Sequence, residues 1–247
     1  MSCQPVVWFR LVPLLSPHHR IITFDNLGTG DTRTPAGPYT MAQLATAAAD
    51  VATAAGLNTV HVVGMSLGGL IAQELSLQHP QLVSSLILVS THAGAPHMTS
   101  DQSSLDAIAR AADLPPEERT QYLSRLAYAK TTPRERIDED LTVRAQHPTT
   151  EEGYRNQVSA TLTWDRLSEL AGITCPTLVL HGAEDQMVSL ANAHQLVQQI
   201  PSAQLTVLSN TGHQLFTDQP QAGSAIILDF VRDVDGGLKR EPARLPH

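Results

Sequence analysis

The chain of 247 residues is long enough for one large α/β domain with an insertion. Its 42% hydrophobic content excludes a disordered chain, and its net charge of −8 argues against nucleic-acid binding, which needs a basic face. No apolar run approaches the roughly 20 residues of a membrane-spanning helix, and the N-terminus lacks the pattern of a signal peptide.

In the first part of the chain, apolar runs alternate with helical patterns. The β-branched run at 20–25 predicts a strand, and the turn-rich stretch behind it predicts a loop. The elements expected next are a helix over 40–56 behind Thr40 as N-cap, a strand over 59–65, a helix over 67–79 and a strand over 82–90. These strands are apolar throughout, which is typical of a parallel sheet with both faces covered.

The pattern changes at residue 97 and resumes at residue 166. Residues 97–165 have helical spacing and no convincing strand, so we predict a helical insertion, in which "RERIDEDL" (134–141) forms a solvated helix face. The expected domain organisation is a core formed by 1–96 and 166–234, with strands over 175–182 and 203–210 and helices over 190–200 and 220–234. The tail, 235–247, has too few apolar residues to pack and is expected to be disordered.

A lone serine, Ser66, stands among three glycines where the strand over 59–65 meets the following helix. A tight strand–turn–helix connection exposes such a serine above the sheet and crowds the residues two positions away, here Gly64 and Gly68. The helix N-terminus behind it suits a developing oxyanion. We therefore interpret Ser66 as a nucleophile, with a serine that only caps the helix as the alternative.

A serine nucleophile needs a base, and the base needs an acid to orient it. Asp185 follows the strand over 175–182, and His213 follows the strand over 203–210, so both lie at strand ends where α/β sheets build sites. The order serine, acid, histidine is the order expected for this kind of triad. Glu184 is the rival acid, and the spacing does not separate it from Asp185.

The remaining polar residues do not indicate a metal or a cofactor. The other histidines show no ligand spacing, and the glycine-rich stretch at 28–32 has no lysine, so we predict neither. Cys3 and Cys175 are interpreted as reduced thiols of a cytoplasmic protein, with one disulfide as the alternative. Met65, beside Ser66, is a candidate for lining an acyl pocket.

The segments "FDNLGTGDT", "GMSLGG", "HGAEDQMV" and "GHQLF" resemble those of the α/β-hydrolase superfamily, in its branch with a helical cap. That branch includes enol-lactonases, carboxylesterases, cofactor-free haloperoxidases and C–C hydrolases. The resemblance implies an α/β-hydrolase fold, with Ser66 as nucleophile, Asp185 as acid and His213 as base. It also implies that the backbone N–H of Leu67 is one oxyanion donor.

The front of the chain departs from that pattern. The family has three strands before the helix that "PVVWFRLVPLL" (5–15) resembles, and the third of them ends in a His-Gly loop with the second oxyanion donor. No His-Gly precedes Trp8. The expectation is therefore a fold without its first strands, from either a late start or a fragment.

Two classes of function remain open from the sequence. The first is a serine hydrolase that acts on a small carboxylic ester or lactone through an acyl-enzyme, or a haloperoxidase or C–C hydrolase with the same triad. The second is a non-catalytic binding protein or inactive fragment. A small-molecule partner is expected, with no nucleic acid and no membrane. Reading the gene upstream of Met1 would best separate the two classes.

Overall fold

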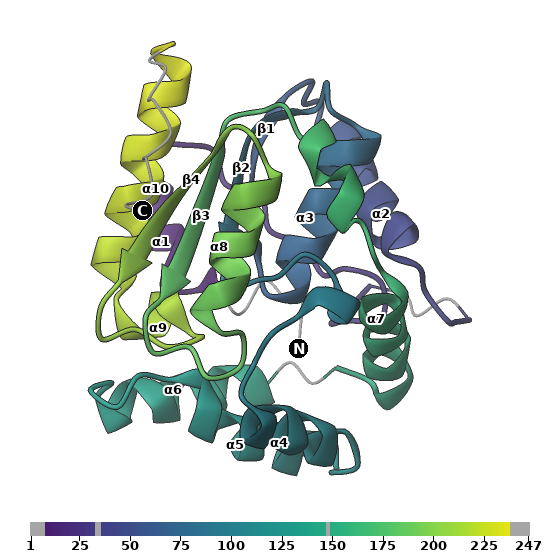
Figure 1. Ribbon diagram of the computed structural model, residues 1–247, viewed down its shortest axis with the longest axis vertical. Helices are drawn as coiled ribbons and strands as arrows, with labels where there is room; N and C mark the ends of the chain where they lie inside the picture. Colours follow the sequence, from purple (N-terminus) through teal and green to yellow (C-terminus); the bar gives the residue numbers. More distant parts are fainter. Residues whose placement is uncertain (1–7, 33–35, 147–148, 238–247) are drawn as a thin grey trace.

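A four-stranded parallel sheet forms the centre of the computed structural model, which describes residues 8–32, 36–146 and 149–237 (Figure 1). The strands lie in chain order: β1 (Val60–Met65), β2 (Val83–Val89), β3 (Thr177–Gly182) and β4 (Ala203–Leu208). Every neighbouring pair is parallel, so all four strands end at the same edge of the sheet. The predicted fold class, a parallel sheet flanked by helices, is confirmed.

Helices cover both faces of the sheet. One face carries α2 (Met41–Ala54), α3 (Leu67–Gln78) and α8 (Leu190–Gln199), and the other carries α1 (Val12–Leu15) and α10 (Pro220–Asp235). Because alternate side chains of a strand point to opposite faces, Leu88 of β2 joins the first core while Ile87 and Val89 join the second. Thr40 caps α2 as expected, in a reciprocal capping box with Gln43.

The stretch between β2 and β3 is helical in the residues that the structure describes. It contains η2 (Ala95–His97), α4 (Gln102–Ala112), α5 (Pro116–Ala127), α6 (Arg134–Ala145), α7 (Glu151–Thr163) and η3 (Leu167–Gly172). In Figure 1, α4, α5 and α6 lie beyond the arrowheads of β3 and β4, at the carboxyl end of the sheet. An isolated bridge between Gly94 and Asp165 brings the two ends of the insertion together.

A buried carboxylate of the core holds the end of the insertion. Glu74 of α3 is only 1% exposed, and its Oε2 accepts hydrogen bonds from Trp164 Nε1 at 2.8 Å and from Arg166 Nε at 3.2 Å. A buried carboxylate of this kind is stable because charged and neutral donors both satisfy it. These contacts fix the exit of the insertion on the helix that follows Ser66.

The predicted solvated face over 134–141 is wrong at one position. Asp140 of α6 is 2% exposed and accepts hydrogen bonds from Tyr128 Oη at 3.0 Å and from Thr217 Oγ1 at 2.6 Å. Burial, together with this carboxylate, raises the pKa of Tyr128. Asp140 is buried because α6 packs on α9 (Leu215–Asp218), a contact that a local charge pattern does not reveal.

The predicted strand over 20–25 is also wrong. These residues have no regular secondary structure, and Ile22 is 37% exposed. A strand needs a neighbour for its backbone groups, and β1 pairs only with β2 within the described part of the chain. An apolar, β-branched run is therefore left as an extended segment beside the edge of the sheet.

The structure describes only part of the two ends of the chain. The last helix, α10, continues to Asp235, so residue 235 belongs to the fold, while 238–247 lie outside the described residues. Of the segment over 5–15, only α1 and the turns before it are described, and Cys3 lies outside. Cys175 is a free thiol. Among the described helices, none has the length and apolar character needed to cross a bilayer.

Candidate active site

Ser66 lies in the sharp connection between β1 and α3, with φ 54° and ψ −121°. Positive φ is costly for a residue with a side chain, about 1–3 kcal/mol, and such strain is concentrated at functional sites. A Cβ at Gly64 would collide with the Gly68 carbonyl and lie 2.7 Å from Ala72 Cβ, so only glycine fits there. Gly68 differs from the expectation, because a Cβ there would meet nothing within 4 Å.

The backbone around Ser66 is held from the neighbouring strand. Ser66 N donates to Val89 O at 2.9 Å, and Thr91 Oγ1 donates to Ser66 O at 2.7 Å. Leu67 is the first residue of α3, so its N–H has no acceptor within the helix and is available for an oxyanion at Ser66. The connection thus has the geometry of a nucleophile elbow.

Asp185 and His213 are brought together from the ends of β3 and β4. His213 Nδ1 donates to Asp185 Oδ2 at 2.9 Å, and both side chains are at most 4% exposed. The other carboxylate oxygen, Oδ1, accepts the backbone N–H groups of Met187 and Val188, each at 2.9 Å. With both oxygens occupied in this way, Asp185 holds the imidazole with its proton on Nδ1, which leaves Nε2 as an acceptor.

The rival acid, Glu184, points elsewhere. Its Oε2 accepts the backbone N–H of Lys130 at 3.3 Å, and it is only partly buried. The structure therefore favours Asp185 as the partner of His213. No hydrogen bond joins the Ser66 hydroxyl to His213 in the described part of the chain, although both residues line one cavity. Such contacts are often long without substrate and tighten when it binds.

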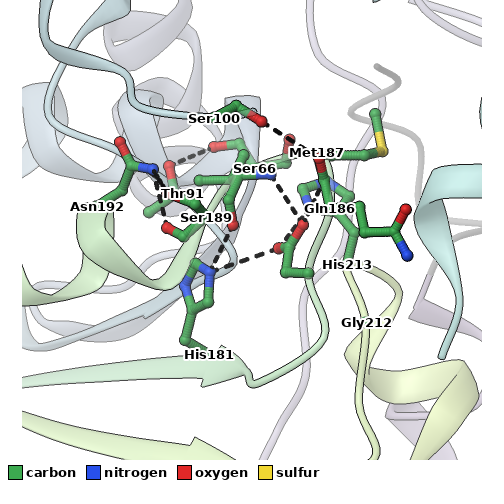
Figure 2. Close-up of polar contacts among 12 residues, drawn as sticks. Ser66, Thr91, Ser100, His181, Gln186, Met187, Ser189, Asn192, Gly212 and His213 are labelled. Atoms are coloured by element: carbon green, nitrogen blue, oxygen red, sulfur yellow. Dashed lines mark hydrogen bonds and ion pairs between the residues drawn. The ribbon is translucent and has the colours of Figure 1, made fainter. Parts of the chain in front are cut away.

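A second histidine contacts the same carboxylate. His181 Nε2 donates to Val188 O at 2.8 Å and lies 3.5 Å from Asp185 Oδ2 (Figure 2). Burial lowers the pKa of His181, so it stays neutral, and its N–H helps to fix the turn that carries Asp185. The sequence analysis set His181 aside with the other histidines, and this was wrong in one respect, because His181 and Asp185 are four residues apart.

Residues of the insertion form hydrogen bonds near the turn that carries Asp185 and near the loop that carries His213. Asn192 Nδ2 donates to Thr99 O at 2.7 Å, just beyond the Asp185 turn. The carboxylate of Asp218 accepts Gly212 N at 2.6 Å and Ala129 N at 3.1 Å, next to His213. Burial raises the pKa of Asp218, and these donors oppose the shift. The insertion is therefore bonded to the histidine loop as well as placed over it.

A cavity of about 1050 Å³ opens at Ser66 and His213. Met65 and Met187 line it from the core, and Leu123, Tyr128, Leu141 and Tyr154 line it from the insertion. Apolar walls with a few convergent polar groups are typical of a small-molecule site. The position of Met65 agrees with its proposed role in an acyl pocket. No cluster of three or more potential metal ligands occurs among the described side chains.

His92 lies three residues after the end of β2 and is 4% exposed. Burial lowers its pKa to about 4 from 6.5, and its Nδ1 accepts Gly94 N–H at 3.2 Å. The unfolded chain therefore binds a proton more readily than the folded chain between these two pH values. The stability contributed by neutral His92 is complete above pH 6.5 and is lost as the pH falls to about 4.

We expect His92→Asn to flatten the pH dependence of stability. Asparagine keeps an acceptor for Gly94 N–H but does not titrate, which removes a slope of up to about 1.4 kcal/mol per pH unit. Urea unfolding at a series of pH values measures the change. The pH dependence of stability that His181 contributes has the same sign and is present in both proteins. Equal slopes for the two proteins would show that His92 titrates normally in the folded state.

Comparison with known proteins agrees with this geometry. The sequence matches the α/β hydrolase fold family over residues 5–220. It is 30% identical to a poly(3-hydroxyalkanoate) depolymerase of Ectopseudomonas oleovorans over 91% of this chain and 79% of that protein. The structure is similar to a hydrolase from Pseudomonas aeruginosa PA01, with a TM-score of 0.77, 25% identity and coverage of 91% and 84%.

The same fold occurs in an enol-lactonase from Burkholderia xenovorans LB400, with a TM-score of 0.81 and 23% identity, covering 94% of this chain and 88% of that one. At this identity the likeness concerns the fold alone. The family match extends over most of the chain and includes Ser66, Asp185 and His213. The chain belongs to the α/β hydrolase fold family.

Proposed function

We propose that this protein is a serine hydrolase that cleaves a small carboxylic ester or lactone. The observation that carries the proposal is the buried His213–Asp185 hydrogen bond beside a cavity that Ser66 also lines. A strained serine at a helix N-terminus, a histidine with a free Nε2 and a carboxylate behind it are the parts that acyl transfer requires. The resemblance to a depolymerase and a hydrolase supports the same reaction class.

The proposed reaction has two steps. Ser66 Oγ attacks the carbonyl carbon while His213 Nε2 accepts the hydroxyl proton, and Leu67 N–H donates to the oxyanion. The ester C–O bond breaks, and His213 returns the proton to the leaving alkoxide. Water then attacks the acyl-serine with His213 again as the base, which releases the acid and regenerates Ser66. Asp185 stabilises the imidazolium in both steps.

Trapping of the acyl-enzyme tests the proposal. We expect p-nitrophenyl acetate to give a burst of nitrophenol and an acetyl group on the peptide that contains Ser66, detected by mass spectrometry after acid quenching. A lactone of similar size should be opened through a hydroxyacyl group on Ser66, because its leaving oxygen stays attached to the acyl chain. Binding of either compound without turnover, or turnover with no acyl group on Ser66, would contradict the proposal and favour a binding protein.

A further inference from the structure

His181 is the second-last residue of β3, and its imidazole is fully buried beside the turn that carries Asp185. Its Nε2 donates to Val188 O at 2.8 Å. A carbonyl oxygen only accepts hydrogen bonds, so the ring proton is on Nε2. The other ring nitrogen, Nδ1, is buried and has no partner in the part of the chain that the structure describes. Because an unpaired buried nitrogen destabilises the fold, the imidazole needs a compensating role, which its Nε2–H can supply.

The same ring nitrogen also lies close to the carboxylate of the site. His181 Nε2 is 3.5 Å from Asp185 Oδ2, the oxygen that accepts the hydrogen bond from His213 at 2.9 Å (Figure 2). Burial lowers the pKa of His181, so the ring stays neutral and acts on the carboxylate as an N–H dipole, not as a full charge. Oδ2 therefore has two N–H groups near it, one from each histidine.

We propose that His181 is a positioning residue of the active site, which acts on His213 through Asp185. This role rests on the serine hydrolase function proposed above. A second N–H near Oδ2 stabilises the negative carboxylate and weakens it as an acceptor for His213. Asp185 then orients His213 without holding the imidazolium too strongly, so the proton can pass on to the leaving alkoxide.

Two more histidines act electrostatically on this site. His194 of α8 acts on His181, and His92 acts on His213. Burial keeps His92 neutral above about pH 4, and the carboxylate of Glu184 accepts a backbone N–H of the insertion instead of facing the site. Removal of His194 is therefore the matched control, because it deletes a nearby histidine that does not bond to the carboxylate in the described ranges.

The pH dependence of ester turnover tests the proposal. His181→Leu removes the donor, whereas His181→Gln keeps an amide donor at a similar distance from the backbone. Turnover falls on the acid side as His213 is protonated, so the acid limb of kcat/KM for p-nitrophenyl acetate reports how strongly Asp185 holds the imidazolium. We expect this limb to move up by about half a pH unit in His181→Leu, with KM changed less than about twofold. The limbs of His181→Gln and His194→Gln should stay with that of the wild type.

The sign of the shift separates this role from a purely structural one. If His181 only held the turn through Val188 O, its loss would loosen Asp185, weaken the hydrogen bond to His213 and move the acid limb down. A downward shift or no shift in a folded His181→Leu protein would therefore overturn the proposal. A His181→Gln protein that behaves like His181→Leu would overturn it as well, because the donor would then not be what matters.

A measurement on the wild-type protein decides the case in which His181→Leu does not fold. By nitrogen NMR of protein with isotope-labelled histidine, we expect His181 to carry its proton on Nε2 and His213 to carry one on Nδ1. A proton on Nδ1 of His181 would overturn the proposal, because Nε2 would then present a lone pair to the carboxylate. A wild-type protein with the expected tautomers but no ester turnover would contradict the serine hydrolase function, and not the contact between His181 and Asp185.

Discussion

Replacing Ser66 with alanine is expected to abolish labelling by a fluorophosphonate probe and to lower ester turnover at least about 1000-fold. The probe reacts with a serine only when a base takes the hydroxyl proton and donors stabilise the oxyanion. Ser66 is the residue at the strained connection beside Leu67 N–H, in the cavity that His213 lines. Gel fluorescence measures the labelling, and p-nitrophenyl acetate hydrolysis measures turnover.

Ser84→Ala is the matched control for this experiment. Ser84 is on β2, outside the cavity, and its loss should change neither labelling nor turnover. Thermal unfolding should be similar for the three proteins, because the Ser66 side chain makes no hydrogen bond to cap α3. Labelling that persists in the Ser66→Ala protein would remove Ser66 from the proposed role.

Asp185→Asn is expected to lower turnover by about four decades, whereas Glu184→Gln should change it less than threefold. Asp185 Oδ1 accepts two backbone N–H groups, so an asparagine would keep its carbonyl oxygen there. Its NH₂ group would then face His213 Nδ1 and force the ring proton onto Nε2. In that tautomer His213 cannot accept the proton of Ser66, and loss of the correct tautomer has an effect of this size in other triads.

The kinetics separate a chemical role from a structural one. The loss should appear in kcat, with KM changed little, because neither carboxylate contacts the substrate in the proposed mechanism. Glu184→Gln keeps an acceptor for Lys130 N–H and serves as the control. If Glu184→Gln is the damaging change and Asp185→Asn is nearly neutral, Glu184 is the acid and the hydrogen bond at Asp185 is structural.

Local signals were enough for most of the fold. The apolar runs at β1 to β4 and the N-cap at Thr40 each depend on neighbours in sequence, and each element was predicted within a few residues. The same holds for Ser66, since the requirement for glycine at position 64 follows from a turn of a few residues. Loop positions at the ends of β3 and β4 were enough to name Asp185 and His213 as candidates.

Other features required the packed chain. Asp185 and Glu184 are adjacent in sequence, and only the turn held by Val188, Met187 and His181 directs one of them to His213. The charge pattern around Asp140 predicts a surface residue, and only the packing of α6 on α9 buries it.

The segment over 20–25 shows the limit most clearly. Its β-branched composition is that of a strand, but composition alone does not supply a neighbouring strand to pair with. A strand forms when its backbone groups find partners on a neighbouring strand, and that partner comes from a distant part of the fold. Within residues 8–32, 36–146 and 149–237, β1 pairs with β2 alone, so residues 20–25 form no strand there.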